Sequence, residues 1–374
     1  MESITRAAGA LLGTRLSDPV DLGGSRRSTV LRCATADGGS VIVKAFTDEP
    51  AALRAFTAEA AGLSLALAGP ELLAVAADPP LLVMADLGSA PTLADVLLGP
   101  DAAAAERGLS AWARGLGRLG AGSVHRRADL AALWARYDKG MPSWDDEPWI
   151  PANAAALPGV IEAAGSTVPP GLEADLARIG TAGGGQYPAF TPGDTCPDNN
   201  LITPQGLRLI DFEAACFQSV FLTAAYCSMP FSTCWCVFRL PTGMGEALEE
   251  IYRQEAVAAY PALAEDAVWR AGMRQAAAVW TVDATVRLLP RATQADTPMH
   301  RTRRPVPTVR QVLLHRWERA AGLTEFPAFA DTFRRLLRQT AAGWDVPPLP
   351  PYPAFTAPAP GTPTGRPLLG DTAR

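Results

Sequence analysis

Two carboxylates and a carboxamide stand close together in the middle of the sequence, in TPGDTCPDNNLITPQGLRLIDFE over residues 191–213. Asp194 is followed five residues later by Asn199, and a short apolar stretch then leads to Asp211. Transfer of a phosphoryl group needs such side chains together, because one carboxylate positions the acceptor hydroxyl while a carboxamide and a second carboxylate hold metal ions on the nucleotide phosphates. The spacing predicts Asp194 as the catalytic base. It also predicts Asn199 and Asp211 as ligands of Mg²⁺, which prefers oxygen donors.

A lysine upstream fits the same chemistry. The chain has only two lysines, Lys44 and Lys139, and Lys44 ends the apolar run VIVK. A lysine on such a strand typically holds the α- and β-phosphates of a nucleotide. Glu59, on the next predicted helix, is the expected ion-pair partner. Glu49 is the alternative partner, but it directly precedes a proline and is expected in a loop.

A glycine-containing turn precedes that strand. The segment Gly23–Ser28 (GGSRRS) lies one strand before VIVK, although it lacks the G-x-G-x-x-G pattern. By itself it predicts only a hairpin turn. Its position suggests that the backbone N–H groups of Gly24–Arg27 and the hydroxyls of Ser25 and Ser28 contact phosphate oxygens.

The surrounding pattern predicts an α+β protein with two lobes. Residues 1–85 are expected to form a small, mostly antiparallel sheet with one helix, from strands at 15–22, 29–34, 40–46, 72–76 and 81–84 and a helix at 50–67. Residues 86–91 are a predicted hinge, 92–346 a mainly helical lobe, and 347–374 a Pro-rich tail. Helices are predicted at 92–98, 101–121, 127–138, 171–180, 215–229, 245–258, 262–289, 308–321 and 326–342. The stretch 139–170 is expected to be irregular, and Tyr352 and Phe355 to attach the first part of the tail to the body.

Composition narrows the classes of protein. The 374 residues suffice for two packed lobes, and 48% hydrophobic with 19% charged residues indicates a globular chain. A net charge of −5 gives no reason to expect a nucleic-acid partner, and no protein partner is inferred. The first residues lack the apolar core of a signal peptide. We therefore expect a cytoplasmic protein with reduced thiols at Cys33, Cys196, Cys216, Cys227, Cys234 and Cys236.

For three further features we favour an interpretation that involves no functional site. The uncharged stretch 214–238 contains several polar residues and Pro230, so a buried segment is preferred to a membrane span. The cysteines at 227–236 lack the paired spacing and histidines of a zinc site, and Cys196 is considered separately as an adventitious modification site. Eight arginines between Arg287 and Arg319 are expected on solvated surfaces, with a rim for an anionic or neutral acceptor as the alternative.

Together these motifs resemble the aminoglycoside phosphotransferase and choline kinase-like family of small-molecule kinases. The resemblance rests on VIVK with Glu59, on LLVMADLG, on GDTCPDN and on LIDFE. It implies a protein-kinase-like fold with ATP, or GTP, between the lobes and adenine against the backbone of the segment that holds Met84, Asp86 and Leu87. It also implies Mg²⁺ on Asn199 and Asp211 and a small hydroxylated acceptor.

The sequence departs from that family at two points. Pro192 stands where the family usually has the histidine of H-G-D, and Leu119-Gly120 stands where the family has a Leu-His pair. Together they suggest a divergent subgroup. Pro192 and the weak glycine-containing turn keep a second hypothesis open, that of a non-catalytic, kinase-like nucleotide-binding protein. A scaffold without a nucleotide site is the third. The identity of the acceptor stays open in the sequence.

Overall fold

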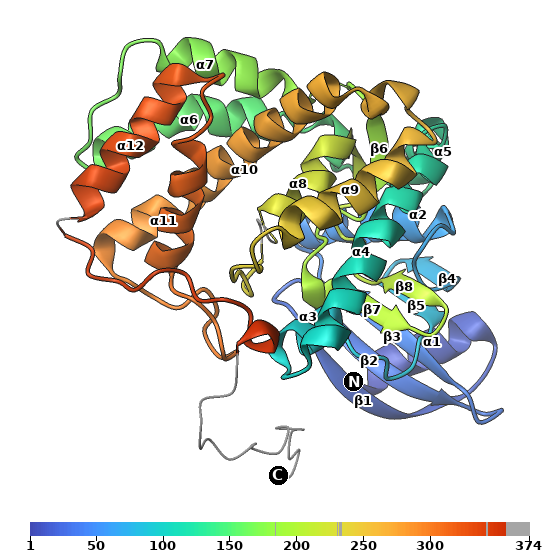
Figure 1. The fold of residues 1–374 in the computed structure, drawn as a ribbon. Coiled ribbons are helices and arrows are strands. Elements are labelled where there is room, and N and C mark those ends of the chain that lie inside the picture. Colours follow the sequence, from blue (N-terminus) through green and yellow to red (C-terminus); the bar gives the residue numbers. More distant parts are fainter. Residues whose placement is uncertain (184, 230, 232–233, 342, 357–374) are drawn as a thin grey trace.

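The computed structural model describes residues 1–183, 185–229, 231, 234–341 and 343–356. The chain forms two lobes, one built on a sheet and the other mainly helical (Figure 1). The sheet of the N-terminal lobe is antiparallel, with strand order β1-β2-β3-β5-β4. Its strands are β1 (Leu16–Gly24), β2 (Ser28–Thr35), β3 (Ser40–Phe46), β4 (Leu72–Ala77) and β5 (Pro80–Ala85). All five predicted strands are confirmed to within a few residues.

The alternation of side chains along β3 gives the sheet two different faces. Val41 and Val43 pack in a small apolar core beneath α1 (Glu2–Leu12). Because successive side chains of a strand point to opposite faces, Ile42 and Lys44 face the helical lobe. The register places Lys44 in the middle of the sheet, beside Val30 of β2 and Leu82 of β5.

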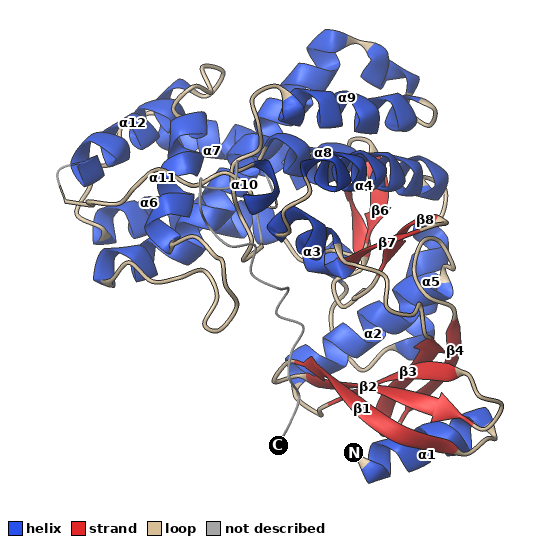
Figure 2. Ribbon diagram, turned by 60° about the horizontal axis from the view of Figure 1, so that its bottom comes forward, coloured by secondary structure: helices blue, strands red, loops and turns tan. Residues whose placement is uncertain are grey.

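Two helices cover this sheet, one on each face (Figure 2). The predicted helix at 50–67 is α2 (Pro50–Ser64), which lies between the sheet and the helical lobe. The helix α1 on the opposite face was not predicted. Its buried residues are Thr5, Ala8 and Gly9, and such small side chains give a weak apolar pattern.

The C-terminal lobe contains ten α-helices among the described residues. They are α3 (Leu93–Leu98), α4 (Ala102–Ser123), α5 (Arg127–Tyr137), α6 (Trp149–Ala163), α7 (Leu172–Gly180), α8 (Val220–Ser228), α9 (Met244–Val257), α10 (Asp266–Gln294), α11 (Val309–Ala320) and α12 (Pro327–Ala341). Two small antiparallel sheets support the segment that carries the motifs. They pair β6 (Pro188–Thr191) with β9 (Cys216–Ser219), and β7 (Asn200–Thr203) with β8 (Gly206–Leu209). Helices α4 and α8 lie beside these strands, α9 packs on α4 and α8, and α6, α7, α10, α11 and α12 form the outer part of the lobe (Figure 1).

Two predictions for this lobe were wrong. The stretch 139–170 is not irregular, because α6 buries Ile150, Ala154, Leu157 and Ile161, spaced as one face of a helix, against α10. Its prolines obscured this pattern in the sequence. The predicted helix at 215–229 begins instead as strand β9, whose backbone pairs with β6 before α8 starts. Pairing with a distant strand overrides the local preference there.

The first part of the Pro-rich tail returns to the helical lobe. Tyr352 is fully buried, and its hydroxyl donates a hydrogen bond to the backbone oxygen of Cys236 over 2.9 Å. The prediction that Tyr352 attaches the tail is therefore confirmed, whereas residues 357–374 of the predicted tail lie outside the described residues. Within the part of the chain that the structure describes, every helix is too short or too polar to cross a bilayer.

Candidate active site

A cleft of about 560 Å³ separates the two lobes. All ten residues predicted to contact nucleotide or metal line it: Gly24, Ser25, Ser28, Lys44, Glu59, Met84, Asp86, Leu87, Asn199 and Asp211. Asp194, the predicted base, does not line the cleft itself but belongs to the loop that forms its floor. Residues from five separate parts of the sequence are thus brought to one place.

Lys44 joins the two lobes at the centre of this cleft. Its Nζ donates to Glu59 Oε2 over 2.5 Å and to Asp211 Oδ1 over 2.7 Å. Lys44 is 6% exposed and Glu59 2% exposed, so the first pair is almost completely removed from water. The lysine, the glutamate and the aspartate of three separate motifs therefore form one ionic network.

Burial and neighbouring charges shift the pKa values of Lys44 and Glu59 in opposite directions. Burial by itself lowers the pKa of Lys44, but the negative charges of Glu59 and Asp211 outweigh it and raise the pKa above its usual value. Burial raises the pKa of Glu59 to about 7, although the ammonium of Lys44 opposes this shift. The lysine thus remains a cation, held in place by two carboxylates.

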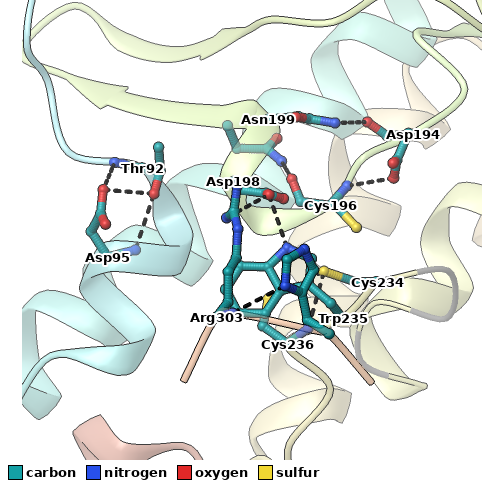
Figure 3. A network of polar contacts seen from close by, with 12 residues as sticks. Thr92, Asp95, Asp194, Cys196, Asp198, Asn199, Cys234, Trp235, Cys236 and Arg303 are labelled. Carbon is teal, nitrogen blue, oxygen red and sulfur yellow. Dashed lines mark hydrogen bonds and ion pairs between the residues drawn. The ribbon is translucent and has the colours of Figure 1, made fainter. Parts of the chain in front are cut away.

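The loop that carries Asp194 has a fixed backbone shape. Gly193 has φ +92°, and a Cβ added there would lie 2.4 Å from the backbone oxygen of Ala214, so only glycine fits. The N–H of Cys196 donates to Asp194 Oδ1 over 3.1 Å, and the Asn199 amide nitrogen donates to the backbone oxygen of Asp194 over 3.2 Å (Figure 3). The second bond leaves the amide oxygen of Asn199 as the atom suited to ligate a metal ion.

The pKa of Asp194 differs from that of an ordinary aspartate. Burial raises this pKa, hydrogen bonds from Cys196 lower it in part, and the charges of Asp198 and Asp211 raise it again. A carboxylate with a raised pKa accepts a proton more readily, which is the property of a general base.

Asp211 is held at the end of β8 by its neighbours. The N–H of Ile210 donates to the backbone oxygen of Asn199 over 3.0 Å, which fixes the two predicted metal ligands relative to each other. Asp211 has φ +66°, a conformation that non-glycine residues rarely adopt and that occurs preferentially at functional sites. Phe212 is buried against α2, where Gly62 permits the close approach because a Cβ there would lie 3.1 Å from the ring. The helix of Glu59 and the strand of Asp211 therefore pack directly together.

The glycine-containing turn closes one side of the cleft. Gly24 has φ +141°, and Ser25 and Ser28 exchange backbone hydrogen bonds across the turn. Arg27 extends from it to form an ion pair with Glu213, two residues beyond Asp211. Nothing in the sequence indicates this ion pair, because 186 positions separate the two residues.

The hinge is fixed by Asp86. Its carboxylate pairs with Arg32 over 2.7 Å and accepts hydrogen bonds from the Ser40 hydroxyl over 2.7 Å and the Gly88 N–H over 2.9 Å. These contacts occupy both carboxylate oxygens. Asp86 therefore shapes the hinge with its side chain, and the backbone of this segment is the part available to a nucleotide base.

A second group that sequence reasoning missed also lines the cleft. Asp198 Oδ2 accepts hydrogen bonds from Trp235 Nε1 over 2.9 Å and from Arg303 Nη1 over 3.0 Å (Figure 3). The Arg303 guanidinium also lies over the Trp235 ring, 4.6 Å from its centroid. One of the eight clustered arginines thus reaches the cleft, and another, Arg316, is buried in the helical lobe at 2% exposure. Arg316 departs from the expected solvated surface, whereas the Arg303 side chain remains 50% exposed, as expected.

A larger cavity, of about 820 Å³, lies elsewhere in the helical lobe. It is bounded by the segment before α6, by β9 and by α10, and its lining includes Trp144, Asp145 and Trp149. It contains none of the motif residues. The cleft between the lobes, although smaller, is where the groups suited to phosphoryl transfer meet.

Similarity to known proteins is found by comparing structures rather than sequences. No protein-family model matches the sequence, and no curated protein matches it. A phosphotransferase of the APH(2″) type, solved with GDP and kanamycin, superposes with a TM-score of 0.50 at 14% identity, over 88% of this chain and 99% of that one. The chain shares the fold of that enzyme. The predicted two-lobed, protein-kinase-like fold is therefore confirmed.

Other structures with lower scores are similar over comparable lengths. The macrolide 2′-phosphotransferase MphH from Brachybacterium faecium is 16% identical, with a TM-score of 0.49, over 78% of this chain and 94% of that one. A choline/ethanolamine kinase family protein from Mesorhizobium loti is 16% identical, with a TM-score of 0.46, over 90% of this chain and 99% of that one.

Proposed function

We propose that this protein is a kinase that transfers the γ-phosphoryl group of ATP or GTP to a hydroxyl of a small molecule. The observation that supports this most strongly is the placement of Lys44 between Glu59 and Asp211, beside the loop of Asp194 and Asn199. A protein that had lost phosphoryl transfer would have no need to keep all five groups. The departures from the family pattern, at Pro192 and Gly120, affect residues outside this network.

In the proposed reaction, Asp194 accepts a hydrogen bond from the acceptor hydroxyl and takes its proton as the new O–P bond forms. The Cys196 N–H fixes the orientation of the Asp194 carboxylate for this task. Lys44 offsets the negative charge of the phosphates, and Glu59 keeps its ammonium in place. Most of the rate enhancement would come from such positioning and electrostatic stabilisation.

The residues present fit a bound Mg²⁺. Asn199 and Asp211 would hold it, because an amide oxygen and a carboxylate oxygen are hard donors. When bound, the ion neutralises charge on the nucleotide phosphates. The fixed backbone between the two residues, through the Ile210 N–H, keeps them ready for it.

A screen for nucleotide consumption tests the proposal. Mg·ATP and Mg·GTP are offered with pools of aminoglycosides, macrolides, amino alcohols and sugars, and the Asp194→Asn variant serves as the blank. We expect acceptor-dependent release of nucleoside diphosphate and a phosphorylated product by mass spectrometry, neither of which the variant gives.

Two other outcomes would contradict the proposal in different ways. A Mg²⁺-dependent thermal shift with nucleotide but no product in any pool would favour a non-catalytic nucleotide-binding protein. The absence of a shift with any nucleotide would favour a scaffold.

A further inference from the structure

Three cysteines meet behind the loop of Asp194. Cys196 lies within that loop, and Cys234 and Cys236 lie after α8, about forty residues further along the chain. The Sγ atoms of Cys234 and Cys236 are 3.2 Å apart. The three side chains are 5% exposed or less, and all three cysteines are free thiols. A group of buried thiols has few strong hydrogen-bond partners, since the S–H group is a weak donor and acceptor.

A carboxylate completes the group. The Sγ atoms of Cys196 and Cys234 and a carboxylate oxygen of Asp198 all lie within 4.8 Å of one another. Two thiolates on one tetrahedral zinc ion lie about 3.8 Å apart, given Zn–S bonds of about 2.3 Å. Cys196, Asp198 and Cys234 are within small side-chain adjustments of that geometry. Cys236 lies outside this 4.8 Å group but its Sγ is 3.2 Å from that of Cys234, so a rotation of its side chain would be needed to bring it to the same ion.

The surroundings also suit a metal centre. Carboxylates that ligate metals are usually oriented by further hydrogen bonds. Asp198 is held in this way by Trp235 and Arg303 (Figure 3). A zinc ion bound by several thiolates and a carboxylate carries net negative charge, and the guanidinium of Arg303 offsets part of it.

We propose that Cys196, Asp198, Cys234 and Cys236 form a Zn²⁺-binding site that fastens the loop of Asp194 to the segment after α8. Two of the ligands lie between Asp194 and Asn199 in sequence, so a bound ion would restrain the backbone that carries both. Four protein ligands leave no open position, which is typical of a structural rather than a catalytic zinc ion. The site differs from the Mg²⁺ site in its donors, which are three soft sulfurs and one carboxylate oxygen instead of oxygens alone.

The first test measures metal in the full-length protein, produced without a histidine tag in zinc-supplemented medium and purified without chelators. We expect about one zinc per chain by mass spectrometry, as for a structural site. The Cys196→Ser and Cys234→Ser variants should lose most of this zinc. Cys33→Ser, which changes a buried thiol of the N-terminal lobe, is the matched control and should retain it. Zinc retained by the Cys196→Ser/Cys234→Ser double variant would overturn the proposal.

A second measurement avoids variants that fail to fold. Co²⁺ added to the unaltered protein, after removal of zinc, should give the intense absorption of cobalt–thiolate charge transfer and be displaced by Zn²⁺. Restoring zinc should also raise the melting temperature, because an ion that binds only the folded state stabilises it. The absence of both zinc and a cobalt–thiolate band would refute the site, as would a disulfide among these cysteines in freshly purified protein. Neither readout depends on an acceptor or a nucleotide, so failure here leaves the proposed kinase activity separately testable.

Discussion

The two sides of the loop 193–199 differ in the chemistry of their side chains. The nucleotide side presents an ammonium, carboxylates and a carboxamide, from Lys44, Glu59, Asp211 and Asn199. The other group, which we call the thiol side, consists of Cys196, Cys234 and Cys236, none of which lines the cleft. One short loop thus separates oxygen donors, which suit Mg²⁺, from sulfur donors, which suit Zn²⁺. A single loop can thus be held in place by ionic contacts on the nucleotide side and, in the proposed zinc site, by metal–thiolate bonds on the thiol side.

The largest effect is expected on the nucleotide side, from Asp194→Asn. Loss of a general base typically lowers kcat by about 10²–10⁴-fold. Nucleotide affinity should stay within about twofold, because the change removes a group that acts in the transition state. Steady-state kinetics with the acceptor found by screening, together with nucleotide titration, measure both. Asp331→Asn on α12 is the control, and the zinc content of Asp194→Asn should be unchanged. An unaltered turnover number would show that Asp194 is not the base.

The next largest effect is expected from Lys44→Met, which leaves Glu59 buried without its ion-pair partner. Removing one member of a buried ion pair typically costs about 3–5 kcal/mol of unfolding free energy. Urea unfolding should detect this loss, and the thermal shift with Mg·ATP should disappear. Because Glu59→Gln removes the orphaned charge, the Lys44→Met/Glu59→Gln double variant should be more stable than Lys44→Met alone. Equal stability of the two variants would mean that the two residues are not coupled.

Gly193→Ala tests whether both sides depend on one backbone. The new Cβ would meet Ala214 at φ +92°, and such strain typically costs about 1–3 kcal/mol. Gly140→Ala is the matched control, since Gly140 also has positive φ but no atoms near its would-be Cβ. We expect Gly193→Ala to lower both turnover and zinc affinity more than the control does. A loss on one side alone would show that the two sides are independent of each other.

The dependence of rate on pH gives a further test of the nucleotide side. Burial raises the pKa of Asp194 above the 3.8 of an ordinary aspartate, and the base must be ionised to act. As pH falls through this raised pKa, kcat/KM should therefore fall about tenfold per pH unit. The midpoint should lie above pH 3.8 and be absent from the residual activity of Asp194→Asn. A flat profile in the unaltered enzyme would exclude Asp194 as the titrating group.

The smallest effect is expected from Arg27→Gln, which removes the ion pair between the glycine-containing turn and Glu213. The Arg27 side chain is 36% exposed, so the pair contributes about 1 kcal/mol or less to stability. We expect a few-fold rise in KM for the nucleotide and little change in kcat. Arg26→Gln, at the neighbouring position, is the control. If both variants behave alike, the pair with Glu213 does not close the cleft.

The sequence by itself was enough to predict which side chains form the nucleotide side. Lys44 lies on a strand whose alternating apolar residues fix its face, and Glu59 lies on a helix whose first residue is a proline. Such local patterns encode local structure, because periodicity and turn residues act over a few positions. The order of these motifs resembles that of a known kinase family, and this resemblance supplied the expected arrangement of the two lobes.

Only the tertiary structure decided the rest. Cys196 and Cys234 meet because the loop of Asp194 and the segment after α8 are packed together, and nothing in their spacing indicates this contact. Arg27 and Glu213 likewise approach each other from different lobes. The strand β9 was mistaken for helix because its partner, β6, lies more than twenty residues earlier in the chain. In each case the deciding interaction joins residues far apart in sequence, and its strength depends on packing that no local pattern specifies.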